Sequence, residues 1–354
     1  MKKILVIQRE PLLSGVQKVF LSEYENLQEQ YEYHLVCNAT GPLTECVPQQ
    51  NFHIVARMKR KINIINDLVV LYELYGIIRR LRPDIVHTHS SKPGIYGGIL
   101  KLFLSFKLVH TVHGFSFTNS QSHLFYLFSM LLEGLFGRAR DLTIVLTKRD
   151  YAKACGIGLR PERLLILKNA PNKTSIAGGI SKTKNTFCWM GRIEPQKDPL
   201  TFVKAAILCL DERQDVVFEV WGEGGLSAIL QAEIDSISVE KQKRIRLMGW
   251  CDDPMEVLSK CEYFVSTSLY EVMPFVLLEA MVARCNIIAS NIPEHFETIE
   301  DYNFMPFPIQ DHITLSRIML ETSSRAGCKN LPVYQLQSPE DRADQLNNIY
   351  KELT

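Results

Sequence analysis

The chain has 354 residues, of which 46% are hydrophobic and 22% are charged, a length and composition typical of a globular enzyme with two α/β domains. No low-complexity run or repeat of solenoid length occurs, which excludes disordered and repeat architectures. The net charge is +1, but residues 1–172 carry a balance of +9 and residues 173–354 one of −8, so we expect the two halves to face different partners.

The N-terminal segment Met1–Ile7 predicts a first buried strand. Its apolar stretch is too short for a secretory signal, and no later segment reaches the apolar length that spans a bilayer. The nine cysteines lack CxxC spacing, which favours reduced thiols in a cytoplasmic protein. We therefore expect a cytoplasmic location.

In the first half, short apolar runs alternate with amphipathic stretches, the pattern of a parallel sheet covered by helices. We predict helices at 66–81 and 123–138, and Pro83 ends the first of them. The predicted strands are Ile4–Ile7, His34–Cys37, His53–Val55, Asp84–Thr88, Leu108–Val112, Leu142–Leu146 and Leu164–Leu167.

Two histidines end neighbouring predicted strands, His89 after one and His113, followed by Gly114, after the next. Clustered histidines suggest a metal site first. However, no carboxylate or cysteine is spaced in the sequence to complete such a site. We therefore predict that this cluster holds no metal.

Residues 169–184 contain Pro, Gly, Ser, Thr and Lys without periodicity and predict an interdomain linker. The predicted strands that follow are Phe187–Met190, Val216–Trp221, Arg244–Met248, Tyr263–Ser266 and Asn286–Ala289. We predict Rossmann-like domains at 1–172 and 173–335, facing each other across a cleft. A C-terminal helix within 336–354 could belong to either domain on sequence alone, and we expect it to pack back on the first. Open α/β sheets bind ligands at the carboxyl ends of their strands, so we expect the functional residues in the loops there.

The loop after the first strand of the second domain carries Gly191, Arg192 and Lys197. The glycine permits close approach of a ligand to the backbone, and the two cations can stabilise charge on a diphosphate leaving group. A basic turn with solvated side chains is the alternative interpretation. The later Gly222-Glu223-Gly224-Gly225 resembles a dinucleotide fingerprint only superficially, because the third glycine is missing at the required spacing.

The loop after the strand ending at Ser266 carries a second set of candidates. Pro274 suits the first turn of a helix, whose free amides at Phe275 and Val276 favour an anion. Glu271 lies in the loop before this helix and Glu279 lies one turn beyond Phe275. One carboxylate can thus reach a sugar and the other a ribose. Two solvated surface glutamates are the alternative.

Together these segments resemble the family four glycosyltransferases, a retaining group with the GT-B fold. The resemblance covers nearly the whole chain, in the correct order. It is carried by the Glu-x7-Glu spacing, the Gly-Arg/Lys loop upstream, and by Ser14-Gly15-Val16-Gln17, Pro83-Asp84-Ile85-Val86-His87-Thr88-His89, His113-Gly114 and Gly222-Glu223-Gly224.

The resemblance implies a role for each matching residue. Arg192 and Lys197 would hold the donor diphosphate beside Gly191, and Glu279 the ribose hydroxyls. Glu271 and the amides of Phe275 and Val276 would hold the donor sugar. His113 would lie at the reaction centre, and Gly15 would let the first loop approach the phosphates. The family retains the anomeric configuration and needs no metal or other cofactor, and the chain contains no Asp-x-Asp motif.

The sequence departs from the family pattern at four places. Val272 replaces the usual glycine after the first glutamate and removes backbone freedom beside the sugar. Ser14-Gly15 replaces Gly-Gly, Asn169-Ala170 replaces Asn-Gly, and Arg284-Cys285-Asn286 replaces Gly-x-Pro. None of these departures removes a charged candidate ligand.

The resemblance predicts transfer of a hexosyl or N-acetylhexosaminyl group from a nucleotide sugar such as a UDP-sugar. The alternatives are a nucleotide-sugar epimerase on the same fold and a non-catalytic nucleotide-sugar-binding module. The intact Arg192, Lys197, Glu271, Glu279 and His113 argue against the module, and the basic first half favours an anionic acceptor over the epimerase.

The acceptor domain of this fold is generally the first, and here it is basic. Arg57, Lys59, Arg60 and Lys61 precede a predicted helix, with Met58, Ile62, Ile64 and Ile65 nearby. This pattern predicts docking on the anionic inner face of the cell membrane, with shallow insertion of the four apolar side chains. Lys92 is a candidate phosphate contact. The acceptor would be a lipid-diphosphate-linked glycan of a surface polysaccharide, as in O-antigen lipopolysaccharide or capsule synthesis, and not a nucleic acid. A merely solvated basic face is the alternative.

Overall fold

The computed structural model describes residues 1–12, 15–115, 123–174, 182–300, 302–324 and 336–354. The chain forms two compact units, each built around its own parallel sheet. Unit 1 comprises residues 1–169 together with 339–354, and unit 2 comprises residues 170–338. Among the described helices, none combines the length and apolar character needed to cross a bilayer.

Unit 1 contains a seven-stranded sheet in the order β3-β2-β1-β4-β5-β6-β7. All neighbouring strands run parallel. Most central strands are buried on both faces, which explains their continuous apolar runs in the sequence. The strands are β1 (Lys2–Ile7), β2 (Tyr31–Cys37), β3 (Phe52–Ile54), β4 (Ile85–His89), β5 (Lys107–Thr111), β6 (Leu142–Val145) and β7 (Leu164–Ile166).

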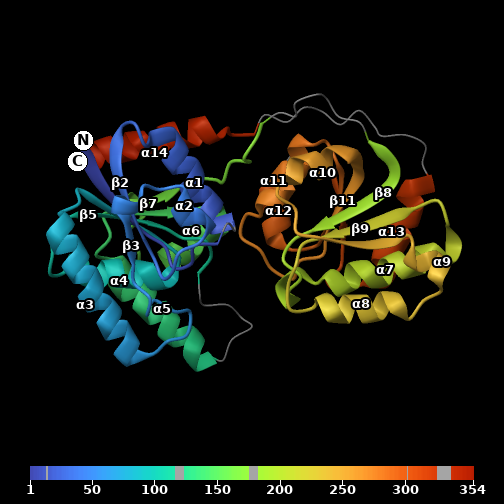
Figure 1. Ribbon diagram of the computed structural model, residues 1–354, viewed down its shortest axis with the longest axis horizontal. Helices are drawn as coiled ribbons and strands as arrows, with labels where there is room; N and C mark the ends of the chain where they lie inside the picture. Colours follow the sequence, from blue (N-terminus) through green and yellow to red (C-terminus); the bar gives the residue numbers. More distant parts are fainter. Residues whose placement is uncertain (13–14, 116–122, 175–181, 301, 325–335) are drawn as a thin grey trace. The chain divides into compact units, whose positions relative to one another are not determined.

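Helices cover both faces of this sheet, with α3, α4 and α5 on one side and α1 and α14 on the other (Figure 1). α3 illustrates the local signals: the Asn63 side chain accepts a hydrogen bond from the Asn66 amide, and Arg82 ends the helix in a left-handed conformation before Pro83. The helices are α1 (Gly15–Leu27), α2 (Pro42–Glu45), α3 (Ile64–Leu81), α4 (Ser91–Lys101), α5 (His123–Gly137), α6 (Lys148–Gly156) and α14 (Pro339–Leu353).

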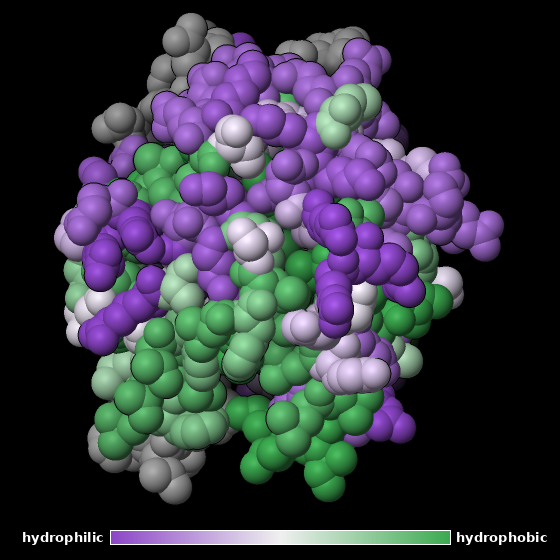
Figure 2. All heavy atoms as spheres, turned by 90° about the vertical axis from the view of Figure 1, so that its left-hand side faces the viewer, coloured by the Kyte–Doolittle hydropathy of each residue, from purple (hydrophilic) through white to green (hydrophobic). Residues whose placement is uncertain are grey.

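The surface of unit 1 is unevenly divided between polar and apolar side chains. In Figure 2, hydrophilic residues dominate the upper part of the visible face, whereas hydrophobic residues gather over its lower part, at the height where α3 and α5 lie in Figure 1.

Unit 2 contains a six-stranded parallel sheet in the order β10-β9-β8-β11-β12-β13. Its strands are β8 (Thr183–Met190), β9 (Val217–Trp221), β10 (Ile245–Gly249), β11 (Cys261–Ser266), β12 (Asn286–Ser290) and β13 (Phe304–Phe307). Its helices are α7 (Pro199–Glu212), α8 (Ser227–Asp235), α9 (Val239–Gln242), α10 (Pro254–Lys260), α11 (Phe275–Val282), α12 (Pro293–Ile299) and α13 (His312–Ser324).

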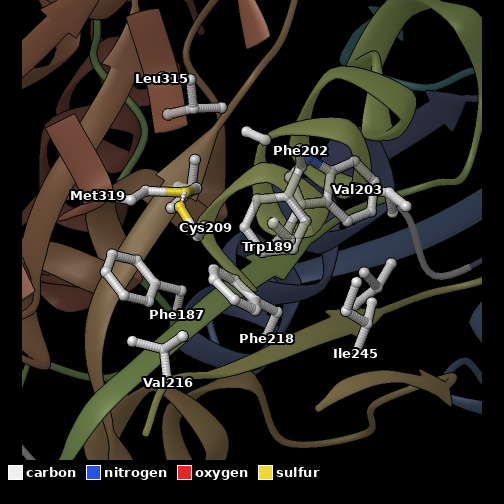
Figure 3. Packing of buried hydrophobic residues seen from close by; sticks show 14 of the residues in the cluster. Phe187, Trp189, Phe202, Val203, Cys209, Val216, Phe218, Ile245, Leu315 and Met319 are labelled. Carbon is white, nitrogen blue, oxygen red and sulfur yellow. Dashed lines mark hydrogen bonds between the residues drawn. The ribbon is translucent and has the colours of Figure 1, made fainter. Parts of the chain in front are cut away.

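The core of unit 2 packs aromatic side chains of three neighbouring strands against α7 and α13 (Figure 3). The Phe187 ring stacks on Phe218, with ring centroids 5.3 Å apart, and on Tyr263, with centroids 4.5 Å apart. This contiguous aromatic layer fixes β8, β9 and β11 beside one another, and the loops after β8 and β11 carry the candidate site.

Both sheets reverse their strand order at one place, between β1 and β4 in unit 1 and between β8 and β11 in unit 2. Ligands of doubly wound folds bind at such a reversal, because the connections leave in opposite directions and open a crevice at the carboxyl ends. The observed sheets confirm the predicted fold of two Rossmann-like parallel-sheet domains.

Candidate functional site

In unit 2, the loops that follow β8 and β11 are joined by several hydrogen bonds. The Trp189 indole N–H donates to Thr267 Oγ1 at 2.9 Å, and the Thr267 hydroxyl lies 2.7 Å from the carbonyl oxygen of Asp198. The Leu269 amide donates to the carbonyl oxygen of Gln196 at 2.9 Å. These bonds place the two predicted donor loops side by side at the reversal of the sheet.

Lys197 and Glu271, one from each loop, form an ion pair. Their side chains are only 16% and 7% exposed, and the Ser268 hydroxyl donates to the same Glu271 carboxylate at 2.7 Å. The structure thus brings together a cation predicted to hold diphosphate and a carboxylate predicted to hold a sugar. A partly buried ammonium of this kind can be shared with an arriving anion without first being desolvated.

The remaining residues of the β8 loop leave space for a ligand. A Cβ on Gly191 would lie no closer than 3.6 Å to its nearest neighbours, the Lys197 and Trp189 side chains, which is an ordinary contact distance. Arg192 is exposed, and its guanidinium lies 3.5 Å from the Gln196 side-chain oxygen. By contrast, Gly222 has a φ of +132°, and a Cβ there would lie 1.9 Å from the Gly191 carbonyl oxygen. Gly222, which follows β9, therefore has a structural role: it lets the β9 loop pack against the β8 loop.

The helix after the β11 loop begins one residue later than the sequence suggests. Pro274 is the N-cap residue of α11 and does not lie in its first turn. Phe275 and Val276 open the helix, so their amides belong to the turn whose N–H groups lack intrahelical acceptors. An anion at this helix start would also be favoured by the helix dipole.

Glu279 lies one turn further along α11 and is 1% exposed. The Asn172 side-chain amide is 3.4 Å from its carboxylate, and both residues line a pocket of about 170 Å³. The pocket also contains Lys173, Asp252, Asp253, Pro254 and Met255. A buried carboxylate in a polar pocket can accept hydrogen bonds from a pair of vicinal hydroxyls.

In unit 1, the structure brings the predicted His113 into contact with His89. His89 Nδ1 lies 3.0 Å from His113 Nε2, and the two rings stack with centroids 5.3 Å apart. Gly114, the next residue, has a φ of +98°, which glycine adopts without strain. The pair ends β4 and β5 at the carboxyl edge of the sheet, as the sequence predicts.

Behind this pair lies a buried polar network that the sequence does not reveal. His87 Nδ1 is 2.6 Å from the Tyr350 hydroxyl, and His87 Nε2 is 2.8 Å from Thr111 Oγ1. The Arg342 guanidinium donates to Glu23 at 2.7 Å, with both side chains almost completely buried. The C-terminal helix α14 therefore supplies two of the residues that support the histidine cluster.

The sequence spacing offers no carboxylate to complete a site with the histidines, but the fold brings one to them. α1 brings Glu23 to His87 and His89, so that one ligand atom from each lies within 4.8 Å of the others. However, Glu23 is already paired with Arg342, and both ring nitrogens of His87 have hydrogen-bond partners. A cation here would have to displace those contacts and lie near a buried guanidinium. The absence of a metal remains a prediction.

Burial keeps the histidine cluster neutral. Burial, with a smaller effect of the Arg342 charge, lowers the pKa of His113 and that of His87 to about 3. The pKa values of His89 and His110 are also lowered well below their usual range by burial. His113 therefore acts near neutral pH as an uncharged hydrogen-bonding group.

The predicted acceptor-side residues lie in and beside the loop before α3. Arg57, Lys59, Arg60 and Lys61 are exposed, whereas Met58 is fully buried, so the expectation that Met58 inserts into a membrane was wrong. Lys92 holds this loop: its ammonium donates to the carbonyl oxygens of Lys59 and Lys61 and pairs with Asp67 at 2.7 Å. A phosphate at Lys92 would have to replace one of these contacts.

Gly15 is exposed and is the first residue of α1, whereas Ser14 lies outside the described residues. The residues that sequence reasoning missed are Glu23, Asn172, Ser268, Arg342 and Tyr350. Ser268 lies in the same loop as Glu271, three residues away. The other four come together with their partners only through the fold, and Asn172 falls within the predicted linker.

Known proteins resemble this chain over most of its length. Residues 13–172 match the family model described as Glycosyltransferase Family 4, and residues 172–312 match the one described as Glycosyl transferases group 1. The chain is 34% identical over 308 residues to the Escherichia coli UDP-Gal:alpha-D-GlcNAc-diphosphoundecaprenol alpha-1,3-galactosyltransferase. This match covers 82% of this chain and 79% of that protein.

Solved structures share the fold along the whole chain. The pneumococcal O-GlcNAc transferase GtfA, in complex with UDP and GlcNAc, has a TM-score of 0.78 at 10% identity and covers 99% of both chains. Anabaena HepE, in complex with UDP and glucose, has a TM-score of 0.76 at 14% identity and covers 100% of this chain and 98% of its own.

Proposed function

Because the chain belongs to the group 1 glycosyltransferases, we propose that it transfers a hexosyl or N-acetylhexosaminyl group from a nucleoside-diphosphate sugar to a lipid-diphosphate-linked glycan. The Lys197–Glu271 pair at the reversal of the unit 2 sheet carries this proposal. The printed activity of the E. coli relative supports a UDP-sugar donor and a polyprenyl-diphosphate acceptor.

In this proposal, the donor diphosphate binds against Lys197, Arg192 and the first amides of α11. The ammonium of Lys197 then shares its charge between the diphosphate and Glu271, which turns toward the hydroxyls of the sugar. Glu279, in its pocket with Asn172, accepts hydrogen bonds from the ribose hydroxyls. His113 contacts the transferred sugar as a neutral group.

The chemical step breaks the bond between the anomeric carbon and the diphosphate oxygen. The acceptor hydroxyl oxygen bonds to the same carbon from the same face, so the configuration is retained. Its proton passes to the departing phosphate oxygen, and the nucleoside diphosphate is the second product. The positive potential of Lys197, Arg192 and the α11 N-terminus stabilises the charge on that leaving group, so we expect no metal requirement.

A two-stage experiment tests the function. A panel of nucleotide sugars is first screened for the one that raises the melting temperature, because a ligand of the native state stabilises it. That donor is then incubated with and without a polyprenyl-diphosphate-linked GlcNAc acceptor. Transfer requires nucleoside diphosphate release that depends on the acceptor. Release without acceptor together with an altered sugar would indicate an epimerase, and binding without turnover would indicate a binding module.

A lipid-linked acceptor also places the enzyme at a membrane. We propose a peripheral location on the inner face of the cell membrane, where the pathways of a surface polysaccharide, O-antigen or capsule, would use its product. Relatives named for capsule and O-antigen biosynthesis support this assignment. Fractionation of cells expressing the protein should recover it with membranes and release it at high salt.

A further inference from the structure

Helix α5 has its large apolar side chains on the outside. Leu127, Phe128, Leu131 and Leu135 are 42%, 45%, 64% and 57% exposed. Their spacing places them within about 100° of arc on one side of the helix. A helix that covers a sheet in water normally turns such a stripe inward.

The fully buried positions of α5 include small and polar residues. Ser129 and Glu133 are buried, and the Glu133 carboxylate is paired with Arg140 at 2.7 Å. Gly134 lies so close to the neighbouring chain that a Cβ there would be 2.7 Å from the Ile157 carbonyl oxygen. Tyr126 and Met130 pack against the core beside these residues, whereas the four large apolar side chains of the outward stripe remain exposed.

Helix α3 repeats this arrangement at the same spacing. Ile64, Ile65, Leu68 and Tyr72 are 75%, 75%, 62% and 78% exposed. The core contacts of α3 come from a separate stripe that contains Val70, Leu74, Ile77 and Ile78. α4 lies between the two helices and contacts both. In Figure 2 the hydrophobic part of the face occupies the region of these helices.

Cations flank the α3 stripe at both ends. The exposed Arg57, Lys59, Arg60 and Lys61 precede the helix, and the exposed Arg79, Arg80 and Arg82 lie at its end. Asp67, near the start of α3, is already neutralised by Lys92. An apolar stripe between two basic clusters fits a surface that offers hydrocarbon beneath anionic headgroups.

We propose that the outward stripes of α3 and α5, with these seven cations, form the surface by which the enzyme docks on an anionic lipid bilayer. This inference rests on the proposed function for its purpose, since a lipid-linked acceptor must be met at a bilayer. Both helices begin at the carboxyl edge of the unit 1 sheet, where His89 and His113 lie. The bilayer would then lie next to the edge where the acceptor is used. A second copy of the chain fits less well, because self-association would oppose the basic clusters to one another.

The test uses Leu131→Gln/Leu135→Gln on α5 and Ile65→Gln/Leu68→Gln on α3. The matched control is Ile229→Gln/Val239→Gln in unit 2, whose side chains are 51% and 63% exposed. Vesicles of phosphatidylcholine with and without phosphatidylglycerol are mixed with each protein and sedimented. We expect each stripe variant to lose at least about tenfold in partition onto anionic vesicles and the control to bind as wild type.

Changing Arg57, Lys59, Arg60 and Lys61 to Gln should remove the preference for phosphatidylglycerol and its salt dependence. The stripe variants and the unit 2 control should transfer sugar at the wild-type rate to a short-chain, water-soluble acceptor. The basic variant is tested for vesicle binding only.

Wild-type vesicle binding by both stripe variants would overturn the proposal. A wild-type dimer in light scattering that these variants dissociate, with vesicle binding unchanged, would assign the surface to self-association instead. Vesicle binding without any sugar transfer would refute the proposed function and leave the docking surface intact.

Discussion

At the scale of single residues, the Lys197–Glu271 pair joins leaving-group binding to sugar binding. Both side chains are largely shielded from water. The charge of each is therefore stabilised mainly by the charge of the other until a ligand binds. This dependence means that truncating either residue disturbs its partner as well.

Replacing Lys197 with alanine should lower kcat/KM for the donor by about two to three orders of magnitude, because a charge-assisted contact to the leaving diphosphate is lost. Steady-state kinetics with a circular dichroism check of folding measures this. Lys241→Ala is the control, since Lys241 forms an ion pair with Asp211 elsewhere in unit 2. Near-wild-type kcat/KM in Lys197→Ala would refute the donor-loop assignment.

Replacing Glu279 with alanine should act on nucleotide binding. The carboxylate lines the pocket with Asn172, so its loss should remove most of the rise in melting temperature that the nucleoside diphosphate alone produces. Glu256→Ala on α10, which breaks an exposed ion pair with Lys260, should keep that rise. If Glu279→Ala were stabilised by the nucleotide as strongly as wild type, the ribose assignment would be wrong.

Turnover should survive treatment with EDTA. Lys197, Arg192 and the N-terminus of α11 already provide the positive potential that a divalent ion provides in metal-dependent transferases. The measurement is the initial rate in chelator, then with Mg²⁺ or Mn²⁺ added back. A complete loss of rate that either ion restores would contradict this and direct attention to Glu23, His87 and His89.

The candidate donor residues can be predicted from the sequence because they lie in a loop that follows a strand or in the first turns of the helix after it. Lys197 and Glu271 were named independently, but their ion pair depends on β8 and β11 being neighbours. No local pattern encodes that neighbourhood. The same limit explains Glu23, which lies on α1 and reaches the histidines only through the fold.

At the scale of elements, α14 is the clearest case of a segment whose place could not be read from its own sequence. It packs on α1 within unit 1, and its Arg342 and Tyr350 enter the polar network around Glu23 and His87. Its amphipathic pattern specifies a helix with one buried face, but not the surface that covers this face.

Replacing Arg342 with methionine should destabilise unit 1 by about 3–5 kcal/mol, because it leaves the Glu23 carboxylate buried without its cation. Burial alone already raises the pKa of Glu23. Adding Glu23→Gln should recover part of the loss, since the unpaired charge is then removed. Urea unfolding monitored by hydrogen exchange of β1 and β4 amides measures both effects. If Arg342→Met alone were as stable as wild type, the Glu23–Arg342 ion pair would not be needed for the stability of unit 1.

The predicted strands were found at every position named, with ends shifted by a few residues. The sheet of unit 2 has one strand more, β13, which contains Pro306. Proline removes a backbone donor and argues against a central strand, yet β13 lies at the edge of the sheet, where this loss is tolerated. The apolar pattern thus predicts the strands of both sheets except this one edge strand of unit 2.

At the scale of the whole molecule, titratable groups are divided unequally between the units. Of the nine histidines, seven lie in unit 1 and two in unit 2. The three tryptophans, Trp189, Trp221 and Trp250, all lie in unit 2. Acid should therefore act mainly on one unit, and tryptophan fluorescence should report on the other.

We expect acidification from pH 7.5 to 5 to destabilise unit 1 before unit 2. The pKa of His87 is lowered from 6.5 to about 3 by burial. Below pH 6.5 the unfolded chain therefore binds a proton that the folded unit cannot accept, and stability falls continuously until the pH approaches 3. At pH 5 this costs about 2 kcal/mol for His87 alone, and His89, His110 and His113 act in the same direction. The protection factors of β4 and β5 amides in hydrogen exchange, taken relative to the intrinsic exchange rate at each pH, should fall while the tryptophan emission of unit 2 stays native. Simultaneous loss of both signals, or protection in β4 that does not change with pH, would show that the buried histidines do not control the acid response.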